Sequence, residues 1–95
     1  MFILMDLKQF EKISKALGDI NRLKILDDMS RKGGSVQCSE IIKVLELAQP
    51  SVSHHIKTLL EAGLIASEKN GRSYTYLLNK QLLDEFVKKL GSFAG

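Results

Sequence analysis

Two adjacent histidines, His54 and His55, are the side chains in this sequence that most readily suggest metal binding or acid–base chemistry. They lie in the segment AQPSVSHHIKTLLEAGL, residues 48–64, whose apolar residues recur at helical spacing. Adjacent side chains on a helix diverge by about 100°, so the two imidazoles are badly placed to share one ion. Neither has an identifiable nucleophile as a partner, so the sequence does not predict an enzyme.

The polar residues of this segment fall on one side of the expected helix. Val52, Ile56 and Leu59 form the apolar side, which belongs in a core. The opposite side carries Ser51, His54, Lys57, Thr58 and Glu61. Short side chains with hydrogen-bonding tips suit a helix that approaches base edges in the major groove. An ordinary solvated surface helix is the alternative, although Lys and Glu would be more usual on it.

Helical periodicity and end signals place further helices around this segment. One is expected over residues 6–17. A second follows the cap Asp19 with Ile20, Leu23, Ile25, Leu26 and Met29 as its apolar face. A third is expected to begin at the cap Ser39. The helix with the histidines is expected over 49–62, with Pro50 in its first turn and Gly63 as its left-handed end. Asn79 is expected to cap a last helix over 80–90.

Two extended segments, residues 64–69 and 72–78, flank Asn70-Gly71, and this dipeptide predicts a β-hairpin. Lys69 and Arg72 lie on either side of the turn. A basic hairpin tip directly after a helix-turn-helix can reach phosphates or a minor groove. Residues 35–38 are too short to classify, although an extended segment fits them.

The expected order is helices, helix-turn-helix, hairpin and final helix. The fold class is therefore mainly α with a small β-hairpin: a winged helix-turn-helix of five helices and a two-stranded wing. Residues 1–95 form one domain, with the helix-turn-helix at 39–63 and the wing at 64–78.

Three segments carry a resemblance to a known family: KALGDINRLKILDDM, SEIIKVLELAQPSVSHHIKTLLEAGLI and EKNGRSYTYLL. In this order they resemble the ArsR/SmtB family of transcriptional repressors, over roughly residues 15–78. The resemblance implies a winged-helix homodimer that binds double-stranded DNA at a palindromic operator. It also implies that Gln49, Ser51, Ser53 and His54 face base edges, and that Arg72 contacts the duplex.

The remaining candidate contacts are less direct. His55 falls on the flank of the apolar side and matches the histidine of the family's Ser-x-His segment, which favours a structural or phosphate-bridging role. Lys57, Lys69 and, with the weakest case, Lys43 are candidate phosphate contacts, and Thr58 lies on the same polar side as His54. Arg22 is expected to form an internal ion pair or to cap a helix.

The metal sites of this family are not matched. The resemblance places the family's Cys-x-Cys pair at Gln37 and Ser39, with Cys38 on the residue between them. A second family site uses Asp and His on the last helix, but residues 79–95 contain no histidine. We therefore predict no metal ligand and no cofactor, and no particular effector. A metal- or redox-responsive repressor with an atypical site stays open as an alternative.

The bulk composition is compatible with this assignment. A net charge of +3 and a pI near 9.1 suit a polyanionic partner, without requiring one. The single cysteine forbids an internal disulfide, and an intracellular, cytoplasmic protein is the simplest expectation. The opening MFILM is too short for a signal peptide or a membrane span. A winged helix that binds protein instead of DNA is a second function, for which more acidic or bulky apolar residues would be expected on the polar side.

Apolar residues near both ends would form a large exposed patch if nothing covered them. The resemblance implies that they are covered in a homodimer, because family members dimerise through these elements, so residues 1–17 and 80–95 are expected to be dimerisation helices. Packing of both end helices within one chain is the alternative. The residues concerned are Phe2, Ile3, Leu4, Leu7, Phe10, Leu82, Leu83, Phe86, Val87, Leu90 and Phe93.

Overall fold

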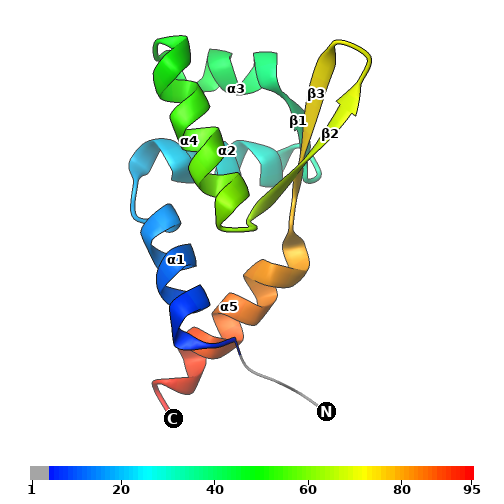
Figure 1. Cartoon of the computed structure of the whole chain (residues 1–95). Coiled ribbons are helices and arrows are strands. Elements are labelled where there is room, and N and C mark those ends of the chain that lie inside the picture. The colour runs from blue at the N-terminus through cyan, green and yellow to red at the C-terminus, as the bar shows by residue number, and fades with distance from the viewer. Residues whose placement is uncertain (1–4) are drawn as a thin grey trace.

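The computed structural model describes residues 5–95, in which helices and strands follow one another in the predicted order (Figure 1). The elements are α1 (Leu7–Leu17), α2 (Ile20–Arg31), β1 (Ser35–Gln37), α3 (Cys38–Leu45), α4 (Gln49–Glu61), β2 (Ile65–Asn70), β3 (Ser73–Leu78) and α5 (Lys80–Ser92). Within residues 5–95, no helix has the length and apolar character needed to cross a membrane.

Polar side chains set the starts of α2 and α5. Asp19 Oδ1 accepts the backbone N–H of Asn21 at 2.8 Å, and Asn79 Oδ1 accepts that of Leu82 at 3.1 Å. Both predicted caps are thereby confirmed, since each oxygen satisfies an N–H that has no partner within its helix.

The predicted cap of α3, Ser39, is wrong by two residues. The helix begins at Cys38, and Ser39 lies inside it instead of capping it. Gln37 occupies the cap position, and its backbone N–H donates to Glu40 Oε2 at 2.9 Å. Gln37 is held extended because it pairs with β3, so the chain turns into the helix directly after this strand.

The sheet has three strands, in the order β1-β3-β2 with antiparallel pairing, where the sequence predicted two. Val36 pairs with Tyr76 in the added strand, and Gly34 O accepts the N–H of Leu78 at 2.8 Å. Gly33 and Gly34 both have positive φ, 84° and 98°, which few other residues adopt readily. The glycine pair therefore returns the chain from α2 to the sheet edge.

The core lies between α1, α2, α3, α4 and the sheet. Its most deeply buried side chains are Ile13, Ile25, Met29, Val36, Ile41, Val52, Leu59 and Leu64. The predicted apolar face of α2 is only partly right, because Ile20 and Leu23 are exposed. Both lie on the first turns of α2, outside the stretch of Ile25, Leu26 and Met29 that faces the core.

Helices α1 and α5 pack against each other at the end of the molecule opposite the wing (Figure 1). Phe10 stacks on Phe86 with ring centroids 4.6 Å apart, and Phe93 meets the Phe10 ring edge-on at 5.3 Å. Part of the terminal apolar set is therefore covered within one chain. Another part is not: Leu7, Val87, Leu90 and Phe93 are between 52% and 65% exposed. Phe2, Ile3 and Leu4 lie outside the described residues.

Candidate nucleic-acid interface

Helix α4 has one side in the core and one side at the surface. Val52, Ile56 and Leu59 are buried, as the sequence predicted. Gly63 ends the helix with φ of 78°, and the N–H groups of Gly63 and Leu64 donate to the carbonyls of Leu60 and Leu59 at 3.0 and 3.1 Å. These two hydrogen bonds fix the last turn of the helix. The buried apolar side chains and the fixed last turn together set the rotation of α4 about its axis.

The start of α4 is also firmly set. Glu46 ends α3 in the left-handed conformation, with φ of 53°, and only Glu46, Leu47 and Ala48 join the two helices. Pro50 lies in the first turn of α4, where no N–H of its own is needed. The short connection holds α3 and α4 in a helix-turn-helix.

The predicted contact residues of α4 share the exposed side of this helix. Gln49, Ser51, Ser53, His54 and Lys57 are all exposed, and Thr58 is half-buried. Lys57 Nζ lies 3.9 Å from Glu61 Oε1, and both side chains are more than half exposed, so this ion pair is open to exchange with a phosphate. Thr58 Oγ1 donates to the carbonyl of His54 at 3.0 Å, so its proton is already used within the helix.

The tip of the wing lies at the same end of the molecule as the start of α4 (Figure 1). Asn70 pairs with Ser73, so the turn consists of Gly71 and Arg72, one residue later than the predicted Asn70-Gly71. Gly71 supplies the positive φ, 64°, at the first turn position. Lys69 and Arg72 are exposed, and Lys69 Nζ lies 6.0 Å from the Tyr74 ring centroid.

The wing lies next to the start of α3, and a cavity of about 250 Å³ lies between them. The sequence did not predict this arrangement. The lining of the cavity comes from Gln37, Cys38, Ser39, Arg72, Ser73 and Tyr74. The cause is the third strand, because the pairing of Gln37 with Thr75 draws the first turn of α3 toward the hairpin. Arg72 therefore lies beside the helix-turn-helix instead of standing apart from it.

His55 is placed differently from its neighbour. The residue is only 9% exposed, and its Nδ1 lies 3.2 Å from Arg22 Nη1. Arg22 in turn donates from Nε to the carbonyl of Ala16 at 2.6 Å and from Nη2 to that of Lys15 at 3.1 Å. The internal, capping role expected for Arg22 is confirmed, and His55 is packed beside it while His54 stays exposed.

Asp19 completes this group of charges. Partial burial would raise the pKa of its carboxyl, but the N–H groups of Asn21 and Arg22 and the positive charge of the Arg22 guanidinium lower the pKa below its usual 3.8. A carboxylate whose pKa is lower in the folded chain stabilises the fold above the unfolded value. This stabilisation is lost as pH falls through the lower, folded pKa, so the cap of α2 persists into acid.

Metal-binding groups do not gather in the described part of the chain. Cys38 is half-buried between the positions of Gln37 and Ser39, neither of which supplies sulfur. Within residues 5–95 of one chain, no three side chains among His, Cys, Asp and Glu lie close enough together to hold an ion.

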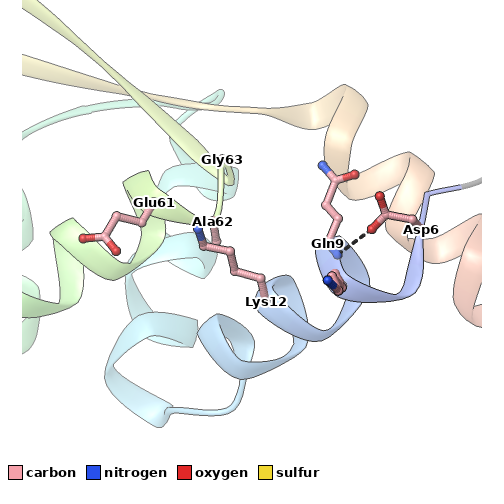
Figure 2. A pocket seen from close by; sticks show the side chains of 7 residues that line it. Asp6, Gln9, Lys12, Glu61, Ala62 and Gly63 are labelled. Atoms are coloured by element: carbon pink, nitrogen blue, oxygen red, sulfur yellow. Dashed lines mark hydrogen bonds between the residues drawn. The ribbon is translucent and has the colours of Figure 1, made fainter.

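A second cavity, of about 520 Å³, lies between the start of α1 and the end of α4 (Figure 2). Its lining includes charged side chains of both signs: Lys8, Lys12, Asp6 and Glu61. The carboxylates are engaged: Asp6 accepts the Gln9 N–H at 2.8 Å, and Glu61 pairs with Lys57. Asp6 therefore caps α1, and Glu61 forms a surface ion pair. The cavity lies at the end of α4 opposite Gln49.

The fold and the exposed side of α4 define a winged helix-turn-helix protein. Comparisons with known proteins identify its family. Residues 19–67 match the model of the family described as bacterial regulatory protein, arsR family. An arsenical resistance operon repressor from Staphylococcus aureus is 34% identical over 86 residues, which cover 90% of this chain and 81% of that protein.

Solved structures share the whole architecture. The crystal structure of an ArsR family transcriptional regulator superposes with a TM-score of 0.85 at 29% identity, covering 97% of this chain and 93% of that one. A homodimeric winged helix-turn-helix domain from Mycobacterium bovis, solved by NMR, gives 0.74 at 22% identity, covering 93% and 80%. The chain belongs to the arsR family of bacterial regulatory proteins and is a winged-helix transcriptional regulator.

Proposed function

We propose that the chain is a repressor that binds an inverted repeat in double-stranded DNA as a homodimer and blocks access of the polymerase. The observation that carries this proposal is the division of α4 into a buried apolar side and an exposed side of short polar residues, next to a basic wing. The likeness to the staphylococcal arsenical resistance operon repressor supports a repressing role.

In this proposal Gln49, Ser51, Ser53 and His54 face base edges, since all four are exposed on α4. Three cations, Lys57, Lys69 and Arg72, lie toward the sugar–phosphate backbone, which attracts positive charge without regard to sequence. Thr58 would join them if its hydroxyl turned from the His54 carbonyl to a phosphate oxygen. His55 contributes indirectly, because its buried ring cannot reach a groove while it packs against Arg22.

The dimer would form through the uncovered apolar side chains of α1 and α5. Leu7, Val87, Leu90 and Phe93 remain exposed although Phe10 and Phe86 are already stacked within the chain. Four large exposed apolar side chains favour association, and the homodimeric relative from Mycobacterium bovis has the same fold. Two-fold symmetry would then set two α4 helices about 34 Å apart, one helical turn of DNA.

Selection of bound fragments from random duplex DNA, at near-physiological salt, tests this function. We expect the recovered fragments to contain an inverted repeat whose half-sites are about one helical turn apart. Recovery of no common sequence would contradict sequence-specific binding. A single, unrepeated half-site would contradict the symmetric dimer but retain DNA binding.

Arg72→Ala should weaken binding to the selected operator and to random duplex alike. If Arg72 neutralises one phosphate, the slope of log K against log salt concentration should become shallower by about one unit. Arg31→Ala is the matched control, because Arg31 is an exposed arginine on α2 that pairs with Asp27 at 3.2 Å. An unchanged salt slope for Arg72→Ala would remove Arg72 from the phosphate contacts.

Zinc or arsenite, titrated into the protein–operator complex, should leave the affinity unchanged. The reason is the donor set: the two family thiolate positions hold Gln37 and Ser39, and Cys38 alone cannot chelate. Fluorescence anisotropy of a labelled operator measures the outcome. Release of DNA at one equivalent of metal would contradict this proposal and favour an atypical site.

We also infer that the chain acts by binding and not by catalysis. His55 contacts Arg22 and lies near Asp19, and neither of these supplies a hydroxyl or thiol nucleophile. A protein-binding winged helix is less well supported, since Ser51, Ser53 and His54 are neither acidic nor bulky and apolar. With DNA as its target, the protein would act in the cytoplasm.

A further inference from the structure

The guanidinium of Arg22 contacts both α1 and α4. In the proposed function, α1 belongs to the dimer interface and α4 binds DNA. Its Nε and Nη2 donate to the carbonyls of Ala16 and Lys15, which lie in the last turn of α1. Carbonyls in the last turn of a helix have no full set of partners within it, and a basic side chain is a favourable partner there. Arg22 therefore fixes the end of α1 from the start of α2.

The third contact of Arg22 reaches α4. Nη1 lies 3.2 Å from His55 Nδ1, and the Arg22 side chain is only 13% exposed. A guanidinium has donors but no acceptor, and it keeps its proton in proteins. Nδ1 of His55 must therefore accept, which requires a neutral ring with its proton on Nε2.

The contact with His55 is sensitive to one proton. Protonation of Nδ1 would remove the acceptor and place a second positive charge beside Arg22. Asp19 offers the competing partner, since its Oδ1 lies 3.9 Å from Nδ1. That oxygen already accepts the N–H groups of Asn21 and Arg22 at 2.8 and 3.4 Å. His54, whose ring centroid is 5.6 Å away, is the other titratable group close to His55.

We propose that Arg22 is a positioning residue for DNA recognition: through a neutral His55 it holds α4 at a fixed position relative to α1, and protonation of His55 loosens this link and weakens operator binding. The proposal rests on the proposed function, in which α1 belongs to the dimer interface and α4 enters the groove. In such a dimer, the link between α1 and α4 sets the spacing of the two recognition helices.

The test uses the fact that the chain has only two histidines. His54→Gln leaves His55 as the single histidine, which removes any direct effect of a His54 charge near phosphates. Its operator affinity should fall at least about tenfold between pH 8 and pH 5, the range in which histidines exchange protons. In His54→Gln/His55→Gln the profile should be flat, because glutamine offers an amide oxygen to Arg22 and does not titrate. Asp19 stays ionised over this range, since its pKa is lowered.

Arg22→Lys provides a second variant that keeps the positive charge but loses the forked geometry. We expect the operator affinity to fall about tenfold with the salt slope unchanged, because Arg22 is a positioning residue and not a phosphate contact. A shallower salt slope would instead identify Arg22 as a direct DNA contact and overturn the proposal. Circular dichroism at each pH confirms that the compared variants are folded.

Nitrogen-15 NMR of the imidazole in the free protein gives a result that does not depend on DNA. We expect His55 Nδ1 to be unprotonated near neutral pH and to respond to Arg22→Lys. If the wild-type protein selects no operator, the proposed function fails, and a protonated Nδ1 would still overturn the inference. If the wild type binds its operator but His54→Gln and His54→Gln/His55→Gln have the same pH profile, only the inference is overturned.

Discussion

Val87→Asp should convert the protein to a monomer and lower its operator affinity at least about a hundredfold. Val87 is 62% exposed on α5, so an aspartate at this position leaves the fold of one chain intact. In a symmetric dimer the substitution occurs twice, and each copy replaces apolar contact with a charge that must lose its hydration. Sedimentation gives the mass of the protein in solution, and anisotropy gives the affinity.

Gln81→Asp is the matched control for this experiment. It adds the same charge to α5, at an exposed polar residue in the first turn, where a negative charge is favourable. The control should remain a dimer with wild-type affinity. A Val87→Asp protein that is still dimeric and still binds its operator normally would show that the interface does not use this face of α5.

Ser51→Ala/His54→Ala should reduce the preference for the operator over random DNA. Each lost base contact costs about 1–3 kcal/mol on the operator. Binding to random DNA depends mainly on phosphates and should change little. The ratio of the two affinities should therefore fall by about one to four powers of ten.

Ser30→Ala is the control for the loss of a hydroxyl group, because Ser30 is exposed and lies on α2, outside the two helices of the helix-turn-helix. Its affinity ratio should match that of the wild type. An equal loss on operator and random DNA in the Ser51→Ala/His54→Ala protein would show that these side chains do not read bases.

Most of the fold could be predicted because its signals are local. Asp19 and Asn79 cap the helices that follow them, and Gly63 ends α4, since these roles depend on a few neighbouring residues. The third strand was not predicted, because Val36 acquires its strand partner Tyr76 only in the folded chain. The same strand places the cap of α3 at Gln37 instead of the predicted Ser39, so the helix begins at Cys38.

The candidate interface was predictable to a similar degree. Helical spacing separates Ser51 and His54 from Val52 and Ile56, so the exposed side of α4 follows from the sequence. The partner of His55 does not, because Arg22 is 33 residues away and meets the ring only through packing of α2 against α4. The position of Arg72 next to the start of α3 could not be predicted either. It depends on the pairing of β1 with β3, and the sequence did not identify β1 as a strand.

Mapping of backbone amide shifts by NMR, with the selected operator added to labelled protein, tests the central claim most directly. We predict the largest changes at Ser51, Ser53 and His54 and at Gly71 in the wing, together with contacts between α4 side chains and thymine methyl groups of the major groove. Changes centred on Lys8 and Lys12 of α1, with the amides of α4 and the wing unmoved, would contradict it.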